Sequence, residues 1–205
     1  MDSTTLLEQN EKLRNQFWSN IGKIDEKVIS TIINPAFQGQ MTWPNMHELY
    51  IVIRTKNRNI ISTDGFSEFT GLELYTETFE KDPANGWARE FVRQVSLNAC
   101  PPNSITPTLD KYGIFSMEVY DVPVPSTFIS KDERIGLLVG MNSSIVPDKL
   151  SINNSGIQYV SLTLLTLAEL EYITVNGTSG RTEVINRLKE KGYNAVSDIT
   201  RKSVI

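Results

Sequence analysis

Few side chains in this sequence are suited to covalent or acid–base chemistry. His47 is the sole histidine and Cys100 the sole cysteine among 205 residues. A Ser-His-Asp or Cys-His arrangement would have to use His47, which stands in a turn just before a predicted strand. Cys100 stands between a predicted helix end and Pro101. We therefore interpret Cys100 as a buried or half-buried thiol and His47 as an exposed loop imidazole.

Carboxylates are the remaining candidates for chemistry, and the chain has many. Zinc needs three or four Cys, His or carboxylate ligands at chelating spacing, so one histidine and one cysteine argue against it. The carboxylates near Asp64 leave open a hydrolytic or small-molecule-binding site, including a metal held by Asp64, Glu68 and Glu73. A charged, solvated face explains the same residues. We predict no catalytic, cofactor or metal site.

One glycine-rich stretch could bind an anion. Residues 177–181 (Gly-Thr-Ser-Gly-Arg) lie at a predicted helix start, where free backbone N–H groups favour negative charge. The sequence has no G-x-x-x-x-G-K-[ST] or G-x-G-x-x-G phosphate-binding motif. A tight turn between two helices needs the same two glycines, and we favour that interpretation.

A polar and aromatic cluster from Asp64 to Gly71 (Asp-Gly-Phe-Ser-Glu-Phe-Thr-Gly) joins two predicted strands. Its two phenylalanines are costly to leave in water unless they pack or bind something. We expect Phe66 to fill the core beneath the loop and Phe69 to stay accessible as an anchor for a partner. The predicted partner-binding residues are Asp64, Glu68, Phe69 and Thr70.

Composition limits the class of partner. Lys and Arg number 20 against 24 Asp and Glu, for a formal net charge of −4, which argues against nucleic acid. No apolar run is long enough to span a bilayer, and the first residues lack the pattern of a signal peptide. One cysteine forbids an internal disulfide and fits the cytoplasm. We expect a cytoplasmic protein with a protein partner and without nucleic-acid or membrane partners.

Apolar periodicity predicts the secondary structure. A 3.6-residue spacing predicts a first helix over Leu6–Ile33, ended by Asn34–Pro35. Thr166 and Glu169 have the spacing of a capping box, and Gly177 ends the helix that follows it. Further predicted helices are Gly86–Cys100, Leu167–Val175 and Gly180–Lys191. Predicted strands are Glu48–Thr55, Arg58–Thr63, Leu72–Glu77 (half-buried), Ile114–Val122, Ile135–Gly140 and Ile157–Leu165, with Ala195–Ile199 and Ser203–Ile205 closing the sheet.

This order of elements predicts a single-domain α+β fold: a mixed, largely antiparallel sheet with helices packed against it. Residues 1–44 are predicted to supply an N-terminal helix and connection that pack on the domain of residues 45–205.

Five stretches in residues 45–205 resemble, in order, the N-terminal domain of the Suppressor of fused family. They are Asn59–Glu68, similar to a strand leading into a Gly-Leu-Ser-Asp-like turn; Thr70–Tyr75, similar to a glycine followed by a Phe/Leu-Glu-Leu strand; Trp87–Cys100, similar to the following helix; Gly156–Glu171, similar to a Gly-Val-x-Phe-Leu strand and Thr/Cys-x-x-Glu-Leu helix; and Ser197–Arg201, similar to a closing Thr-Asp-x-x-Arg.

The resemblance implies protein binding and not catalysis. Animal members resemble scaffolding repressors that hold a transcription-factor peptide, partly by adding it as a strand to their sheets. Bacterial members resemble immunity proteins that neutralise a toxin encoded beside them. The chain departs from the animal pattern in lacking a second, C-terminal domain, so a peptide clamp between two domains is not expected.

The leading hypothesis is therefore a non-enzymatic, immunity-type protein that neutralises a cognate toxin. Two alternatives stay open. One is a small-molecule-binding or hydrolytic enzyme using the carboxylates near Asp64, and the other is a regulatory scaffold without a toxin partner.

Overall fold

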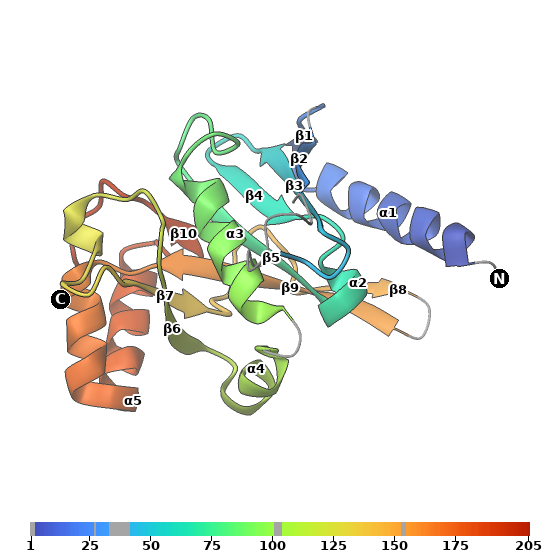
Figure 1. Ribbon diagram of the computed structural model, residues 1–205. Helices are drawn as coiled ribbons and strands as arrows, with labels where there is room; N and C mark the ends of the chain where they lie inside the picture. Colours follow the sequence, from blue (N-terminus) through green and yellow to red (C-terminus); the bar gives the residue numbers. More distant parts are fainter. Residues whose placement is uncertain (1–2, 27, 33–41, 101–103, 153–154) are drawn as a thin grey trace.

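The protein is described by a computed structural model that covers residues 3–26, 28–32, 42–100, 104–152 and 155–205 (Figure 1). Ten strands in this part of the chain form one mixed sheet, in the order β1-β3-β4-β5-β9-β7-β6, with β2 also on β3, β8 also on β9 and β10 also on β5. The strands are β1 Lys23–Ile24, β2 Ile29–Ile32, β3 His47–Arg54, β4 Asn59–Thr63, β5 Leu72–Thr78, β6 Phe115–Val119, β7 Ile135–Val139, β8 Lys149–Ile152, β9 Ser155–Leu164 and β10 Val196–Ser197.

Strand β5 lies at the centre of the sheet. It runs antiparallel to β4 and parallel to both β9 and β10. The other paired strands are antiparallel. This arrangement confirms the predicted α+β class and the mixed, largely antiparallel sheet. The helices are α1 Ser3–Ser19, α2 Ser67–Thr70, α3 Trp87–Ala99, α4 Thr106–Tyr112 and α5 Leu167–Glu190, with a short 3₁₀ turn at Ser126–Phe128.

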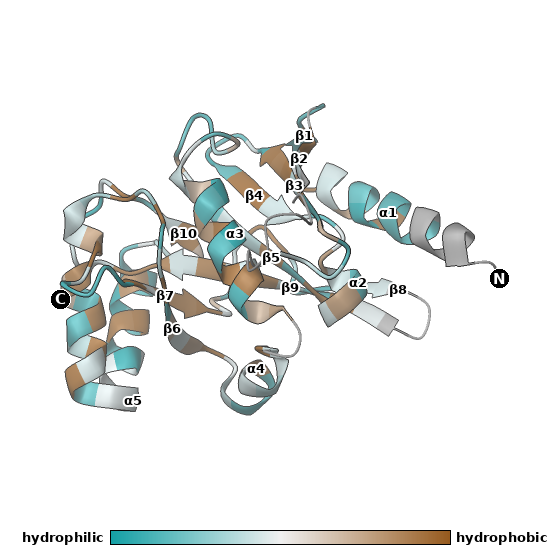
Figure 2. Cartoon of the chain, viewed as in Figure 1, coloured by the Kyte–Doolittle hydropathy of each residue, from teal (hydrophilic) through white to brown (hydrophobic). Residues whose placement is uncertain are grey.

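Helices pack on both faces of the sheet. Neighbouring residues of a strand point to opposite faces, so a single strand contributes to the cores on both sides. Val52 of β3 belongs to the core that contains Phe91 and Val95 of α3. Its neighbour Ile53 belongs to a second core with Trp18 of α1. A third core lies beneath α5. Figure 2 shows apolar residues along the strands and hydrophilic ones on the outer turns of α1 and α3.

The N-terminal helix is shorter than predicted, because α1 ends at Ser19 and residues after it join the sheet. Ile24 pairs with Ile53 of β3, so an apolar residue assigned to a helix face lies in a strand. The chain passes so close to β3 that a Cβ on Gly22 would lie 2.5 Å from the Arg54 carbonyl oxygen. Residues 1–44 thus contribute strands as well as a helix. The predicted stop at Asn34–Pro35 lies outside the described residues.

Other predictions need smaller corrections. Every residue of β5 is buried. The strand was predicted to be half-buried, but the rest of the protein covers both of its faces. Residues 203–205 form no strand, because Arg201 ties this end of the chain to α5 instead. The patterns did not predict α2, α4 or β8, which are short elements with few apolar positions. No helix in the described ranges combines the length and apolar character needed to cross a bilayer.

The C-terminal region confirms the predicted capping box. The Thr166 hydroxyl accepts a hydrogen bond from the Glu169 amide at 3.4 Å, and the Glu169 carboxylate accepts one from the Thr166 amide at 2.9 Å. Gly177 breaks α5 with φ of 58° and ψ of −133°, a backbone conformation that side chains disfavour. The two helices predicted on either side of Gly177 are therefore confirmed; both are labelled α5 and meet at the Gly177 kink.

Candidate functional site

The candidate site is centred on Glu73, a fully buried carboxylate of β5. Its Oε2 accepts a hydrogen bond from the Thr63 hydroxyl at 2.6 Å. Its Oε1 accepts from the Gly65 amide at 2.9 Å and the Ser67 hydroxyl at 2.7 Å. Burial disfavours the charged form and raises the pKa of Glu73 to about 7, although these donors and Arg14 act in the opposite direction. Glu73 therefore anchors the turn that follows β4.

Arg14 of α1 brings a cation to this carboxylate from a distant part of the chain. Its Nε donates to Asp64 Oδ1 at 2.7 Å and lies 3.9 Å from Glu73 Oε1, while its Nη1 lies 3.8 Å from Glu68 Oε1. Arg14 is 4% exposed. Burial lowers the pKa of Arg14 and the surrounding carboxylates raise it, with a net rise, so its charge is held. The ion cluster thus joins α1 to the turn.

The turn itself is a short, well-braced helix, α2. Phe66 is fully buried and packs on Trp43, with ring centroids 5.1 Å apart. Thr70 donates its hydroxyl to the Phe66 carbonyl oxygen at 2.9 Å, and the same hydroxyl accepts from the Leu72 amide at 3.1 Å. Gly71 ends the helix in the left-handed region, with φ of 76°. The hydrogen bonds and the packing together fix the position of this segment.

A hollow of about 260 Å³ opens beside the ion cluster. Among the described residues, three carboxylates line it, from Glu11, Asp64 and Glu68, against one cation, Arg14. Burial, together with the neighbouring Asp64 and Glu11, raises the pKa of Glu68, and Arg14 opposes this. The remaining lining residues are Val28, Trp43, Asn45, His47, Leu49 and Gly65. We call this hollow the acidic pocket; its excess of negative charge favours a cation.

The four predicted partner-binding residues have different surroundings. Asp64 is buried against Arg14, and Glu68 is exposed at the rim of the acidic pocket. Phe69 is half-buried against the main core, and Thr70 is occupied in bracing α2. The predicted core position of Phe66 is confirmed. The structure thus places Asp64 and Glu68 together at a pocket, whereas Phe69 and Thr70 belong to the same turn but do not line the pocket.

Sequence reasoning missed Arg14 and Glu11, the pocket residues that come from α1. A signal was present, because Arg14 precedes Phe17 and Trp18 by three and four residues and so shares their face of the helix. Both aromatic residues are buried against the sheet. A cation on the buried face of a helix needs a carboxylate partner, and this requirement pointed to a buried acid elsewhere in the chain.

The other chemical candidates lie in structural settings. In the described part of the chain, no three His, Cys, Asp or Glu side chains are grouped to hold a metal ion. Asp64, Glu68 and Glu73, the carboxylates considered for a metal, instead surround Arg14, which lies within 4.0 Å of an oxygen of each. Burial raises the pKa of Cys100 to about 11, which keeps the thiol protonated and unreactive at neutral pH.

His47 lies at the edge of the acidic pocket. Its Nε2 is 2.6 Å from the Ser30 hydroxyl on the neighbouring strand β2, and its backbone amide donates to Asn45 at 3.1 Å. The imidazole is thus half-buried beside the pocket and not in an exposed loop. Cys100, the other residue type that occurs once, belongs to the core beneath α3.

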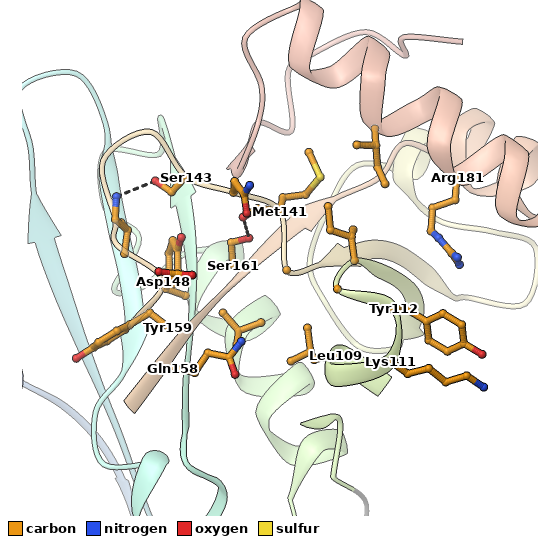
Figure 3. Close-up of a pocket in the computed structure, with 18 of the residues that line it drawn as sticks. Leu109, Lys111, Tyr112, Met141, Ser143, Asp148, Gln158, Tyr159, Ser161 and Arg181 are labelled. Atoms are coloured by element: carbon orange, nitrogen blue, oxygen red, sulfur yellow. Dashed lines mark hydrogen bonds between the residues drawn. The ribbon is translucent and has the colours of Figure 1, made fainter. Parts of the chain in front are cut away.

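A second and larger hollow, of about 970 Å³, lies where the chain between β7 and β8 passes over β9 (Figure 3). The α5 kink and the end of α4 supply its other walls. Arg181 and Lys111 contribute its cations, and Tyr112, at 54% exposure, lies beside Lys111. We call it the large pocket.

Comparison with known proteins supports the fold assignment. No family model and no curated protein matches the sequence. One solved structure does match: a protein from Neisseria gonorrhoeae described as a putative SUFU (suppressor of fused protein) homolog. It superposes with a TM-score of 0.63 at 13% sequence identity, over 96% of each chain. The chain therefore has a Suppressor of fused-like fold, as the sequence resemblance implied.

Proposed function

We propose that this protein acts by binding another protein, with the acidic pocket and the α2 turn as its contact surface. The observation that carries the proposal is the convergence, within the described ranges, of three carboxylates and one arginine on a small hollow. A lysine or arginine of a partner would supply the missing positive charge. The turn needs no reorganisation to receive it, because Glu73 and Thr70 already fix its backbone.

The partner we propose is a toxin that the protein neutralises. The Suppressor of fused-like fold supports this class through the bacterial members that the sequence resembles. A negative pocket on a chain of net charge −4 suits a basic effector such as a nuclease, because opposite charges speed association and exclude wrong partners. A regulatory scaffold would use the same pocket without neutralising a toxin.

The enzymatic alternative has weaker support from the geometry. Glu73 carries a pKa suited to proton transfer, but both of its oxygens accept hydrogen bonds from the turn and it is fully buried. A general acid or base must come within hydrogen-bond reach of the substrate. Asp64 is buried and held by Arg14. The carboxylates near Asp64 are better placed to support the pocket than to react.

The test is to co-express the protein with the product of the neighbouring gene and to measure complex formation and growth. Glu68→Lys reverses charge at the pocket rim and should weaken the complex by about 2 kcal/mol or more, since it also repels the incoming cation. Glu171→Lys, an exposed carboxylate of α5, is the matched control and should leave binding unchanged. Equal loss in both variants would show that the pocket is not the contact surface. Binding without rescue of growth would favour the scaffold.

Two phenylalanines separate folding from binding. Phe66→Ala should lower the free energy of unfolding by about 3–5 kcal/mol, as truncation of a core phenylalanine does. Phe69 is only half-buried, so Phe69→Ala should cost about 1 kcal/mol of stability and about 2 kcal/mol of binding. Thermal melts and calorimetry with the purified partner check both values. If Phe69→Ala unfolds the protein as badly as Phe66→Ala, then Phe69 is core and no part of the contact surface.

A further inference from the structure

The large pocket lies apart from the acidic pocket, and the two share no lining residue. The floor of the pocket is β9. One edge of this strand pairs first with β8 and then with β7, and the pocket lies between these two pairings. Between these pairings the chain of residues 140–148 leaves the sheet. Its backbone bonds to β9 include Gly140 N to Ser161 O at 2.9 Å and Tyr159 N to Asp148 O at 2.8 Å, and the Ser161 hydroxyl donates to the Met141 carbonyl oxygen. This interruption of the strand pairing leaves room for the hollow.

The charges on the walls are unevenly distributed. Figure 3 shows Arg181, Tyr112 and Lys111 on one side of the pocket, and Asp148 on the other; Asp148 is the one carboxylate among the described lining residues. Among the described residues, neither Arg181 nor Lys111 comes within 4.0 Å of a carboxylate oxygen. One side of the hollow therefore carries two positive charges that form no ion pair within the described ranges.

The side chains around these cations suit an oxygen-rich anion. Arg181 is half-buried, which keeps its guanidinium at the wall of the hollow. Thr178 and Thr182 line the pocket from the same turn of α5, directly after the Gly177 kink. Guanidinium groups bind phosphate through paired hydrogen bonds, and an ammonium adds a second positive charge. Hydroxyl and amide groups continue along the wall, from Asn142, Ser143, Gln158 and Ser161.

The size of the hollow narrows the class of ligand. A volume of about 970 Å³ is near the upper end of small-molecule pockets. Inorganic phosphate would fill only a small part of it. Lys111 Nζ lies over one face of the exposed Tyr112 ring, 4.8 Å from its centroid, so the ring leaves only its other face for a planar group to stack on. We propose that the large pocket binds a phosphate-bearing small molecule of nucleotide size, with Arg181 and Lys111 contacting the phosphates.

Calorimetric titration of the full chain with ADP, inorganic pyrophosphate and adenosine tests the proposal. ADP should bind with a Kd below about 1 mM at low salt, pyrophosphate more weakly and adenosine not measurably. The double variant Arg181→Gln/Lys111→Gln should weaken ADP binding at least about tenfold, because it removes both phosphate contacts. Lys189→Gln/Lys191→Gln makes the same change in net charge at exposed positions near the end of α5, and should bind within about twofold of wild type.

Chemical-shift mapping on the wild-type protein keeps the test independent of how the variants fold. The amides of Lys111, Tyr112, Thr178 and Arg181 should shift on addition of ADP. Absence of ADP binding overturns the proposal, as does equal binding by the two double variants. Binding of a hexaglutamate peptide in the absence of ADP binding would identify a peptide surface instead. Each result is separate from the partner-binding test, because Glu68→Lys does not alter the large pocket.

Discussion

Two buried arginines, Arg14 and Arg201, are paired with carboxylates, and they differ in how they bind them. Both terminal nitrogens of Arg201 donate hydrogen bonds to the Glu169 carboxylate at 2.5 Å, and Nη2 also donates one to the Leu164 carbonyl oxygen at 2.9 Å. Arg14 bonds Asp64 through Nε alone, and its buried Nη1 has no hydrogen-bond partner among the described residues. The buried Nε of Arg201 also has no hydrogen-bond partner among the described residues, but both of its terminal nitrogens hold one carboxylate, so we call Arg201 and Glu169 the closed pair. Arg14 and its carboxylates form the open cluster, which lies beside the acidic pocket.

The difference separates a structural ion pair from a candidate site. Glu169 also caps α5 and accepts from the Val204 amide at 2.9 Å, so the closed pair joins three segments. The buried Tyr159 hydroxyl likewise has no hydrogen-bond partner in the described ranges, and the charges of Glu73 and Arg14 act on it. Unused donors beside a hollow are available to a ligand or partner. Both arginines keep one unbound buried nitrogen among the described residues, so the pocket beside Arg14 is what distinguishes the two clusters.

Breaking the closed pair should have the largest effect on stability. Arg201→Met leaves Glu169 buried without its cation and should lower the free energy of unfolding by about 3–5 kcal/mol. Arg187→Met removes a half-exposed ion pair between Arg187 and Glu183, both on α5. It should lower the free energy of unfolding by about 0.5 kcal/mol or less. Urea titration of both variants measures the contrast. Similar midpoints for the two would mean that Arg201 is not a structural tie.

The pH dependence of stability should reveal the open cluster. Glu73 has an ordinary pKa of 4.5 that burial raises to about 7 in the folded protein. Between these values the folded state holds a proton that the unfolded state releases. Stability should therefore fall as the pH rises through this window, by up to about 3 kcal/mol, and level off above about pH 8.

Glu73→Gln removes this titration and isolates it from the other carboxylates. The difference in unfolding free energy between wild type and the variant should be largest near pH 5 and should shrink towards pH 8. Denaturant titrations across that range measure the difference. A constant difference would mean that Glu73 titrates at its ordinary pKa. Glu169→Gln provides the comparison, at a carboxylate tied to Arg201 by two short bonds.

The smallest effect concerns the cap that adjoins the closed pair. Thr166→Ala removes one hydrogen bond to the Glu169 amide and should cost about 1 kcal/mol, the usual value of an N-cap oxygen. Partner binding at the acidic pocket should be unchanged. An unshifted denaturation midpoint would show that Glu169 holds its position without the cap.

Local patterns predicted the elements that depend on local interactions. The Thr166 capping box and the Gly177 break were read correctly because each depends on residues a few positions apart. Strands β3, β4, β5, β7 and β9 followed from runs of β-branched and apolar residues. The burial of these strands on both faces was not predicted, because it depends on helices from elsewhere in the chain. The helical spacing after Phe17 gave a wrong result because Ile24 meets β3, a partner about thirty residues away.

The candidate site was predictable only in part for the same reason. The turn from Asp64 to Thr70 was recognisable from its composition, and Asp64 and Glu68 do line a pocket. The cation that organises them comes from Arg14, fifty positions earlier in the chain. The large pocket gave even less signal, because its walls come from α4, the chain before β8, β9 and α5. Of these walls, only Thr178–Arg181 had been noted in the sequence, as part of the glycine-rich stretch that could bind an anion.

The pairing of β5 affects how the chain folds during synthesis. Strands β3, β4 and β5 leave the ribosome early and can form hairpins, but the parallel partners of β5 come much later: Tyr75 pairs with Ser161, and Glu77 with Val196. Contacts of such long sequence separation form late. Until they form, the edge of β5 stays open to other chains, as a template for aggregation. The nascent protein therefore completes its sheet only after the segment around Ser197 and Arg201 has emerged.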